Sequence, residues 1–234
     1  MSILIPAPPP EFGEALKEQA IELDPGDLER VTRYLELLYE TNERMNLTAV
    51  RDPAAAWMRH IFDALTLLPI VAESGAARVA DIGSGGGVPG LVLACVLPEV
   101  EMTLIESVGK KARFLEETAA ALGLARVRVQ CARAEALGRG ALKGAMDLVV
   151  CRAVARLPVL LGYAMPLLKG GGVFVAIKGE QATAELEASA PALRANKGTL
   201  VDTRRTPTGT LVIIEKIAST RRSRASREGE RPHS

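Results

Sequence analysis

A glycine-rich turn near the middle of the chain, in the segment ARVADIGSGGGVPG, restricts the fold more than any other feature. The segment begins with a short apolar run typical of a strand, and five glycines follow from residue 83 to residue 90. Glycine adopts positive φ angles and allows a ligand to approach the backbone closely. Gly85, Gly87 and Gly90 match the pattern G-x-G-x-x-G, whereas residues 81–87 match D-x-G-x-G-x-G. The turn therefore predicts an α/β sheet with a ligand site at the end of its first strand.

Strand-like and helix-like runs alternate from Arg78 onward. Candidate strands cover residues 79–82, 102–106, 127–130, 148–151 and 173–177, and helical runs cover residues 90–97, 110–122 and 157–168. This alternation predicts a parallel, doubly wound sheet. A helix at about 180–193 and two last strands, 200–203 and 211–216, follow, and the turn signal TPTG between those strands indicates an antiparallel hairpin. This layout is that of the class I, Rossmann-like methyltransferase fold.

The chain divides into four predicted parts. Residues 1–10 form a proline-rich leader that we expect to be disordered. Residues 11–72 carry two Asp-Pro helix starts and apolar residues at helical spacing, which predict an N-terminal helical lobe. Residues 73–217 form the sheet domain. Residues 218–234 contain five arginines and no apolar residue larger than alanine, which predicts a basic disordered tail, either drawn to RNA or merely solubilising.

Composition excludes several classes of protein. Three cysteines lie far apart in sequence, with neither a disulfide framework nor a metal-ligand spacing, so we expect a reducing, cytoplasmic compartment and no metal. The opening MSILIPAPPP lacks the basic flank of a signal peptide, and we expect no membrane span because no apolar run of about 18 residues is evident. With a formal net charge of +1, any nucleic acid would be bound through local basic patches.

The ligand of the turn decides between the two glycine patterns. A dinucleotide has a pyrophosphate that needs free amides at the next helix, but the third glycine of that match follows Pro89, which has no amide. Asp81 adds a carboxylate that repels a pyrophosphate; it either suits the cationic S-adenosylmethionine or fixes the loop by accepting amide hydrogen bonds. The pattern favours S-adenosylmethionine, with Gly83, Ser84 and Gly85 also in contact with it. A turn required only for tight packing is the alternative.

Two further acidic residues follow strands. Glu106 ends the second strand, where its carboxylate can accept hydrogen bonds from both ribose hydroxyls, although a dinucleotide has the same ribose. Glu135 follows the third strand and can reach the edge of an adenine.

The sequence at the end of the fourth strand indicates what kind of atom accepts the methyl group. It lacks the Asp/Asn-Pro-Pro-aromatic loop of amino-group methylases, and Cys151 reads better as a buried thiol than as a nucleophile. With no recognisable acid–base pair, the sequence suits an acceptor nitrogen that carries a lone pair and no proton, such as guanine N7, for which in-line positioning suffices. Arg152 is a candidate for holding the donor or the guanine O6, or is simply a surface arginine.

Several basic residues are candidates for RNA contact. Lys110, Lys111 and Arg113 open a helix, where they oppose its dipole unless phosphates meet them; a solvated face is the alternative. Arg59 and His60 lie on a lobe helix, from which His60 could project toward the cleft and position the substrate, although a lone helix histidine is more often structural. Lys178 follows the fifth strand as a second candidate at the edge of the cleft.

Taken in order, these segments resemble the RsmG (GidB) family of bacterial 16S ribosomal RNA guanine-N7 methyltransferases. The matching segments are NLTAV, RHIFDAL, DIGSGGGVPG, LIESVGKKARFL, ARAE, CRAVARL and IKGE, over roughly residues 30 to 180. The resemblance implies contacts with the methyl donor at Gly83, Val88, Ala134, Glu135 and Arg152. The chain departs from the family in having Glu106 for the usual aspartate, Ala64 for a frequent serine, and a different C-terminal ending.

The residues and the resemblance together predict a bacterial cytoplasmic enzyme that transfers a methyl group from S-adenosylmethionine to a guanine N7 in 16S ribosomal RNA. Its partner would be that RNA or the small ribosomal subunit, with neither a metal nor a membrane involved. A small-molecule methyltransferase and a non-catalytic nucleotide-binding module are the two alternatives.

Overall fold

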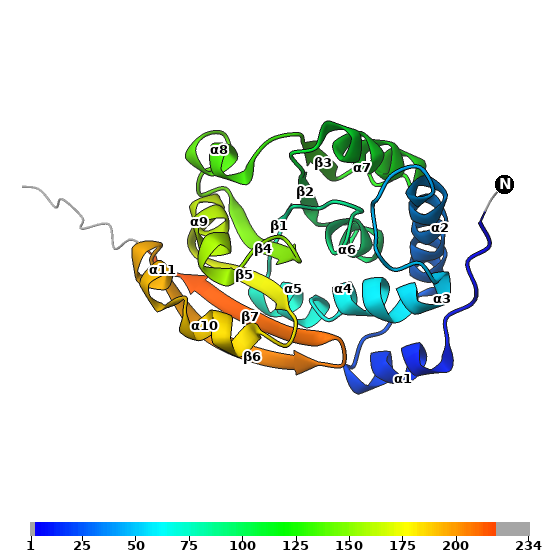
Figure 1. Ribbon diagram of the computed structural model, residues 1–234, viewed down its shortest axis with the longest axis horizontal. Helices are drawn as coiled ribbons and strands as arrows, with labels where there is room; N and C mark the ends of the chain where they lie inside the picture. The colour runs from blue at the N-terminus through cyan, green and yellow to red at the C-terminus, as the bar shows by residue number, and fades with distance from the viewer. Residues whose placement is uncertain (1–2, 219–234) are drawn as a thin grey trace, which may run out of the picture.

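The computed structural model describes residues 3–218 and contains a seven-stranded sheet with helices packed on both faces (Figure 1). The strands are β1 (Arg78–Ile82), β2 (Glu101–Ile105), β3 (Val127–Gln130), β4 (Met146–Arg152), β5 (Leu168–Lys178), β6 (Gly198–Thr206) and β7 (Gly209–Lys216). Their order in the sheet is β3-β2-β1-β4-β5-β7-β6. Strands β1 to β5 are parallel, and β7 pairs antiparallel with both β5 and β6. The predicted doubly wound sheet with a C-terminal hairpin is therefore confirmed.

The order of strands reverses between β1 and β4, which are neighbours although they are far apart in the chain. The carboxyl ends of neighbouring parallel strands diverge at such a point and leave a crevice for a ligand. The glycine turn follows β1 and Arg152 ends β4, so both lie at this crevice.

Helices cover the two faces of the sheet. The helices that follow the first strand are α6 (Gly90–Val96), α7 (Gly109–Ala121), α8 (Ala134–Arg139), α9 (Leu157–Leu167), α10 (Ala182–Glu187) and α11 (Ala190–Ala195). Side chains alternate along β1, so Val79 contributes to a core cluster with α6 and α7, whereas Ala80 packs with α9 on the opposite face. Because helices bury both faces of the sheet, its central strands β1, β2 and β4 are mostly apolar.

The helical lobe consists of α1 (Pro10–Glu18), α2 (Pro25–Asn42) and one long helical run from Pro53 to Ser74. That run comprises α3 (Pro53–Ala56), the π-helical turn η1 (Trp57–Phe62), α4 (Asp63–Leu65) and α5 (Leu68–Ser74). Buried lobe residues such as Leu35 and Ile61 belong to the same hydrophobic cluster as Val79 of β1. The lobe and one face of the sheet thus share a core, and residue 72 does not separate two cores.

The run Pro53–Ser74 bears on the expectation that no segment spans a membrane. By length and composition alone it qualifies as a candidate span, with a mean hydropathy of 1.2. However, 67% of the apolar 18-residue stretch within this run is buried inside the protein, as in the core helix of a folded domain. Its apolar character is accounted for by packing against the lobe and the sheet.

The predicted disorder of residues 1–10 is wrong for the part that the structure describes. Ile5 is buried, and the Trp57 indole nitrogen donates a hydrogen bond to the carbonyl of Pro6 at 2.9 Å. Phe12 packs edge-on against the Trp57 ring at a centroid distance of 5.3 Å. The leader is therefore held on the lobe by burial and by the indole. Nearly all of the predicted basic tail, residues 219–234, lies outside the described residues.

Candidate active site

The glycine turn adopts backbone conformations that only glycine tolerates well. Gly83, Gly85 and Gly87 have φ angles of +69°, +53° and +98°. A Cβ on Gly83 would lie 2.6 Å from a methyl carbon of Val154, in the loop that follows β4. A Cβ on Gly85 would meet nothing closer than 3.7 Å. Val154 therefore fills the space beside Gly83, whereas the space beside Gly85 is open.

Asp81 fixes the turn from inside the protein. Its side chain is fully buried, and one carboxylate oxygen accepts a hydrogen bond from the Gly90 amide at 3.1 Å. The other oxygen has no hydrogen-bond partner within the described part of the chain. Burial raises the pKa of Asp81 to about 7. Of the two interpretations of Asp81, loop fixing agrees with this geometry, and the Gly90 amide that a pyrophosphate would need is already occupied.

Ser84 is buried as well, and its hydroxyl donates to the Asp81 carbonyl at 3.0 Å. Both side chains stabilise the turn, and contact of Asp81 and Ser84 with the cofactor stays a prediction. Val88, expected from the resemblance, is only partly buried and packs against the core shared by lobe and sheet.

Four of the predicted donor contacts line one small cavity of about 80 Å³. They are Gly83, Glu106, Ala134 and Glu135. Glu106 is buried, and its two carboxylate oxygens accept hydrogen bonds from the amides of Gly85 at 3.0 Å and Val108 at 2.7 Å. The carboxylate therefore links the end of β2 to the glycine turn. Ala134 and Glu135 begin α8, a helix that the sequence did not predict.

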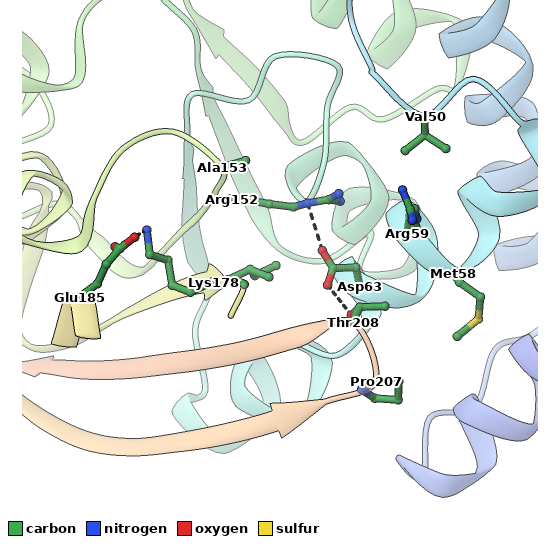
Figure 2. Close-up of a pocket in the computed structure, with 12 residues that line it drawn as sticks. Val50, Met58, Arg59, Asp63, Arg152, Ala153, Lys178, Glu185, Pro207 and Thr208 are labelled. Atoms are coloured by element: carbon green, nitrogen blue, oxygen red, sulfur yellow. Dashed lines mark hydrogen bonds and ion pairs between the residues drawn. The ribbon is translucent and has the colours of Figure 1, made fainter. Parts of the chain in front are cut away.

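A second cavity, of about 640 Å³, lies between the lobe, the ends of β4 and β5, and the β6–β7 turn (Figure 2). Its walls include Met58 and Arg59 from the lobe, Arg152 and Lys178 from the strand ends, and Thr208 from the turn. The loop after β4 borders both cavities: Ala153 lines the larger one and Val154 the smaller one. Ala153 has a φ of +53°, a conformation that costs a non-glycine residue roughly 1–2 kcal/mol.

Arg152 does not extend freely into solvent. Its Nε lies 3.1 Å from an oxygen of Asp63, and its Nη1 lies 3.4 Å from His60 Nδ1. The other oxygen of Asp63 accepts a hydrogen bond from the Thr208 hydroxyl at 2.6 Å, and Figure 2 shows this chain of contacts crossing from β4 to the hairpin turn. The interpretation of Arg152 as a simple surface arginine is therefore wrong, whereas contact with donor or guanine stays a prediction.

His60 is only 6% exposed, which corrects the prediction that it projects into the cleft and contacts RNA. Its Nε2 lies 2.7 Å from the Thr48 hydroxyl. Burial, reinforced by the positive charge of Arg152, lowers the pKa of His60 to about 4, so the ring is neutral at pH 7. Nδ1 also lies 3.0 Å from the Arg59 carbonyl, which can only accept, so these contacts fit a ring that donates from Nδ1 to that carbonyl and accepts the Thr48 hydroxyl at Nε2. His60 is thus fixed within the lobe by Arg59 and Thr48, and its ring packs beside Arg152.

Lys178 is also engaged within the protein. Its ammonium lies 2.7 Å from Glu185 and donates to the Ala155 carbonyl at 2.8 Å. Glu185 accepts a further hydrogen bond from the Leu157 amide at 2.7 Å. Burial opposes ionisation of Glu185, but Lys178 and the amide outweigh it, and the pKa of Glu185 is lowered. With side chains only 10% and 11% exposed, the pair holds the loop after β4, and Lys178 lines the large cavity at the edge of the cleft, where contact with RNA stays a prediction.

The remaining basic candidates divide between two places. Arg59 is exposed at the rim of the large cavity. Lys110 and Arg113 are exposed at the start of α7, beside a separate hollow that also contains Met45. Lys111 is partly buried. The structure therefore does not bring the α7 cations into the cavity that contains Arg152.

Cys151 is buried at the end of β4, and burial raises the pKa of its thiol far above the ordinary value. It is thus the inert strand-end thiol that the sequence favoured over a nucleophile. Among residues 3–218, no three His, Cys, Asp or Glu side chains are grouped so as to hold a metal ion.

Comparison with known proteins adds the family. The sequence profile of the family described as rRNA small subunit methyltransferase G matches residues 27–209. The ribosomal RNA small subunit methyltransferase G of Sorangium cellulosum (strain So ce56) is 45% identical over 213 residues, which cover 90% of this chain and 89% of that protein. The protein of the same name from Desulfitobacterium hafniense (strain Y51) is 41% identical over 207 residues, or 86% and 85% of the two chains.

Among solved structures, the antibiotic-resistance methyltransferase Kmr superposes with a TM-score of 0.52 at 20% identity, covering 64% of this chain and 93% of its own. That likeness concerns the fold. The profile match and the two relatives confirm the predicted resemblance, and with it the enzyme class and its cofactor, S-adenosylmethionine. The chain belongs to the rRNA small subunit methyltransferase G family.

Proposed function

We propose that this protein transfers a methyl group from S-adenosylmethionine to N7 of a guanine in 16S ribosomal RNA. The observation that carries the proposal is the arrangement of two cavities on either side of one loop, with Gly83 and Glu106 at one of them and Arg152 at the other. A transfer reaction needs two adjacent sites of this kind, one for the donor and one for the acceptor.

The smaller cavity fits the adenosyl part of the donor. Gly85 leaves open space above the turn, and the Glu106 carboxylate lies next to it. Each Glu106 oxygen already accepts one backbone amide but has a second lone pair, which can accept a ribose hydroxyl. Glu135 lies farther along the same cavity, where it can reach the adenine edge. The donor, when bound, supplies an electrophilic methyl group on a positively charged sulfur.

The cavity as described is smaller than the donor requires. Its volume of about 80 Å³ lies well below the ~300 Å³ at the lower end of small-molecule sites. Val154 is the side chain that fills the space above Gly83, and it is 38% exposed. Displacement of Val154 toward solvent would therefore enlarge the donor site without moving a strand.

The larger cavity is wide enough for a nucleotide base and ribose. Guanine N7 carries a lone pair, so it attacks a methyl group without first losing a proton. Consistent with this, Asp63 and Glu185, the two carboxylates that line the cavity, are both ion-paired and offer no free general base. Catalysis would then consist of aligning N7 with the donor, with the Arg152 guanidinium donating a hydrogen bond to the neighbouring O6.

The substrate would be 16S ribosomal RNA or the small subunit that contains it, in the cytoplasm. Both relatives have names that refer to the small ribosomal subunit. Arg59 at the cavity rim, and Lys110 and Arg113 on α7, are among the exposed cations available to phosphates. A chain with a net charge of only +1 depends on such local groups rather than on a global field.

The experiment is methylation in vitro of small subunits and of naked 16S RNA prepared from cells that lack this enzyme, with a labelled methyl donor. We expect incorporation at one guanine, mapped as N7-methylguanine by chain cleavage at that base. Label in small molecules but not in RNA would favour the first alternative. Donor binding by calorimetry with no transfer to any acceptor would favour a non-catalytic module, and binding of NAD in place of the donor would overturn the assignment of the cofactor.

A further inference from the structure

We propose that Asp63 is a positioning residue for methyl transfer, which holds the guanidinium of Arg152 in place at the large cavity and couples it to the β6–β7 turn through Thr208. The inference rests on the proposed function, since the acceptor is taken to bind in that cavity. It assigns a role to a residue of the RHIFDAL segment for which neither the sequence patterns nor the comparisons gave one.

Both carboxylate oxygens of Asp63 are used, each by a different segment of the chain. One oxygen lies 3.1 Å from Arg152 Nε at the end of β4, and the other accepts the Thr208 hydroxyl at 2.6 Å. Asp63 itself is 3% exposed and is the first residue of α4, directly after the π-helical turn. One buried carboxylate thus joins the lobe, the sheet and the hairpin at a single point beside the cavity (Figure 2).

The contacts leave one side of the guanidinium available. Nε faces Asp63 and Nη1 faces His60, and Nη2 has no hydrogen-bond partner within residues 3–218. Arg152 lines the large cavity and is 23% exposed in its side chain. The ion pair at Nε and the adjacent His60 ring restrict rotation of the guanidinium, and Nη2 can donate to an acceptor in the cavity.

The chemistry requires a carboxylate at this position. An asparagine has one oxygen: if it accepts the Thr208 hydroxyl, an amide donor faces the Arg152 charge, and if it faces Arg152 instead, it is neutral. The guanidinium would then lose the partner of its Nε and turn within the cavity. Misplacement of a positioning group by about 1 Å can reduce a transfer rate about 100-fold.

A matched control lies on the same helical run. Glu73 of α5 accepts two hydrogen bonds from Arg204 of β6, at 3.1 Å and 2.8 Å, so it also ties the lobe to the hairpin. Glu73 is exposed and lines neither cavity. Glu73→Gln therefore removes a carboxylate that links the same elements without touching the site.

The experiment compares Asp63→Asn, Asp63→Glu and Glu73→Gln in single-turnover methylation of the RNA, with donor affinity measured by calorimetry. We expect Asp63→Asn to lower the transfer rate 10- to 100-fold while the donor Kd changes less than twofold. We expect Asp63→Glu to recover part of the rate and Glu73→Gln to retain the wild-type rate. An unchanged rate in Asp63→Asn, or an equal loss in Glu73→Gln, would overturn the proposal.

Two further measurements separate positioning from folding. Because Asp63 acts through Arg152, the double variant Asp63→Asn/Arg152→Gln should be no slower than Arg152→Gln alone; additive losses would contradict the inference. In ¹⁵N-arginine NMR spectra, the Nε–H signal that disappears in Arg152→Gln should exchange faster with water in Asp63→Asn and remain protected in Glu73→Gln. A signal still protected in Asp63→Asn would contradict the inference even if activity were lost. A wild-type protein that methylates no RNA would refute the proposed function, whereas the NMR result would still report on the contact.

Discussion

Val154 occupies the space that a side chain on Gly83 would need: a Cβ there would lie 2.6 Å from one Val154 methyl carbon. The first glycine of the turn and the loop after β4 are therefore fitted to each other at the wall of the smaller cavity. A substitution at either residue should therefore alter the packing of the other.

Gly83→Ala should destabilise the protein and weaken donor binding. The alanine must adopt a φ of +69°, at a cost of roughly 1–2 kcal/mol, and it also overlaps Val154. Chemical denaturation and donor calorimetry would measure the two effects. Adding Val154→Ala should remove the overlap but not the backbone cost, so the double variant should recover part of the loss. If Val154→Ala recovered nothing, the contact would not be the cause.

Tyr34→Phe should loosen the glycine turn from the lobe side. The fully buried Tyr34 hydroxyl donates to the Gly86 carbonyl at 2.8 Å, and its loss leaves a buried acceptor unpaired, at a cost of about 1–3 kcal/mol. We expect lower stability to denaturant and a higher donor Kd. Tyr39→Phe is the matched control, because that hydroxyl donates to the Val50 and Asp52 carbonyls, away from the turn. The control should lower stability without changing donor affinity; a shift in donor Kd in both variants would argue against a specific effect.

His60 should make stability depend on pH in the acidic range. Its pKa is lowered from 6.5 to about 4 in the folded protein, so the unfolded chain takes up the proton first as pH falls. The stabilisation by the neutral ring is present above pH 6.5 and is lost between pH 6.5 and about 4, by about 3 kcal/mol. Asp81, whose pKa of about 7 exceeds its ordinary value, titrates with the opposite sign in this window.

The measurement is therefore the difference in unfolding free energy between wild type and His60→Gln at several pH values. The stability advantage of the wild type should shrink as pH falls. The chain has one other histidine, His233, in the tail, and His233→Gln should show no such trend. A difference that stays constant with pH would show that His60 titrates normally.

Glu185→Gln should release the loop that separates the two cavities. It leaves the largely buried Lys178 ammonium without its counter-charge, which we expect to cost about 2 kcal/mol, below the 3–5 typical of fully buried pairs. Glu36→Gln breaks the exposed pair with Arg33 and should cost under about 1 kcal/mol. Because the pKa of Glu185 is lowered, its contribution is present above its ordinary value of 4.5 and is lost as pH falls below it. Equal losses in the two variants would mean that burial of the Lys178 pair has no special effect.

The sequence predicts helices and strands best where the spacing of apolar residues is regular. All seven strands are expected from the sequence. The central parallel strands are short apolar runs, and the limits of the edge strand β3 match because valines alternate with polar residues in VRVQ. The helix α8 was missed, since its six residues contain too little apolar periodicity to show. The helix expected at about 180–193 is two helices, and Pro191 opens the second one.

The site residues likewise fall into those that local sequence pattern predicts and those that it does not. The glycine turn, Glu106 and Arg152 were found because local pattern places them at strand ends. Asp63 and Glu185 were not, because their roles depend on partners 145 and 28 residues away in the chain, Thr208 and Leu157. His60 was misplaced because the π-helical turn shifts side-chain directions relative to a regular helix, and spacing alone does not reveal such a turn.

The core that the lobe shares with the sheet has a consequence for engineering. A cut or crossover near residue 72 would expose apolar surface on both fragments, so neither half should survive as an independent, protease-resistant piece. Attempts to graft another enzyme's recognition helices onto this sheet should fail at the level of expression unless the facing residues of α6 are exchanged as well.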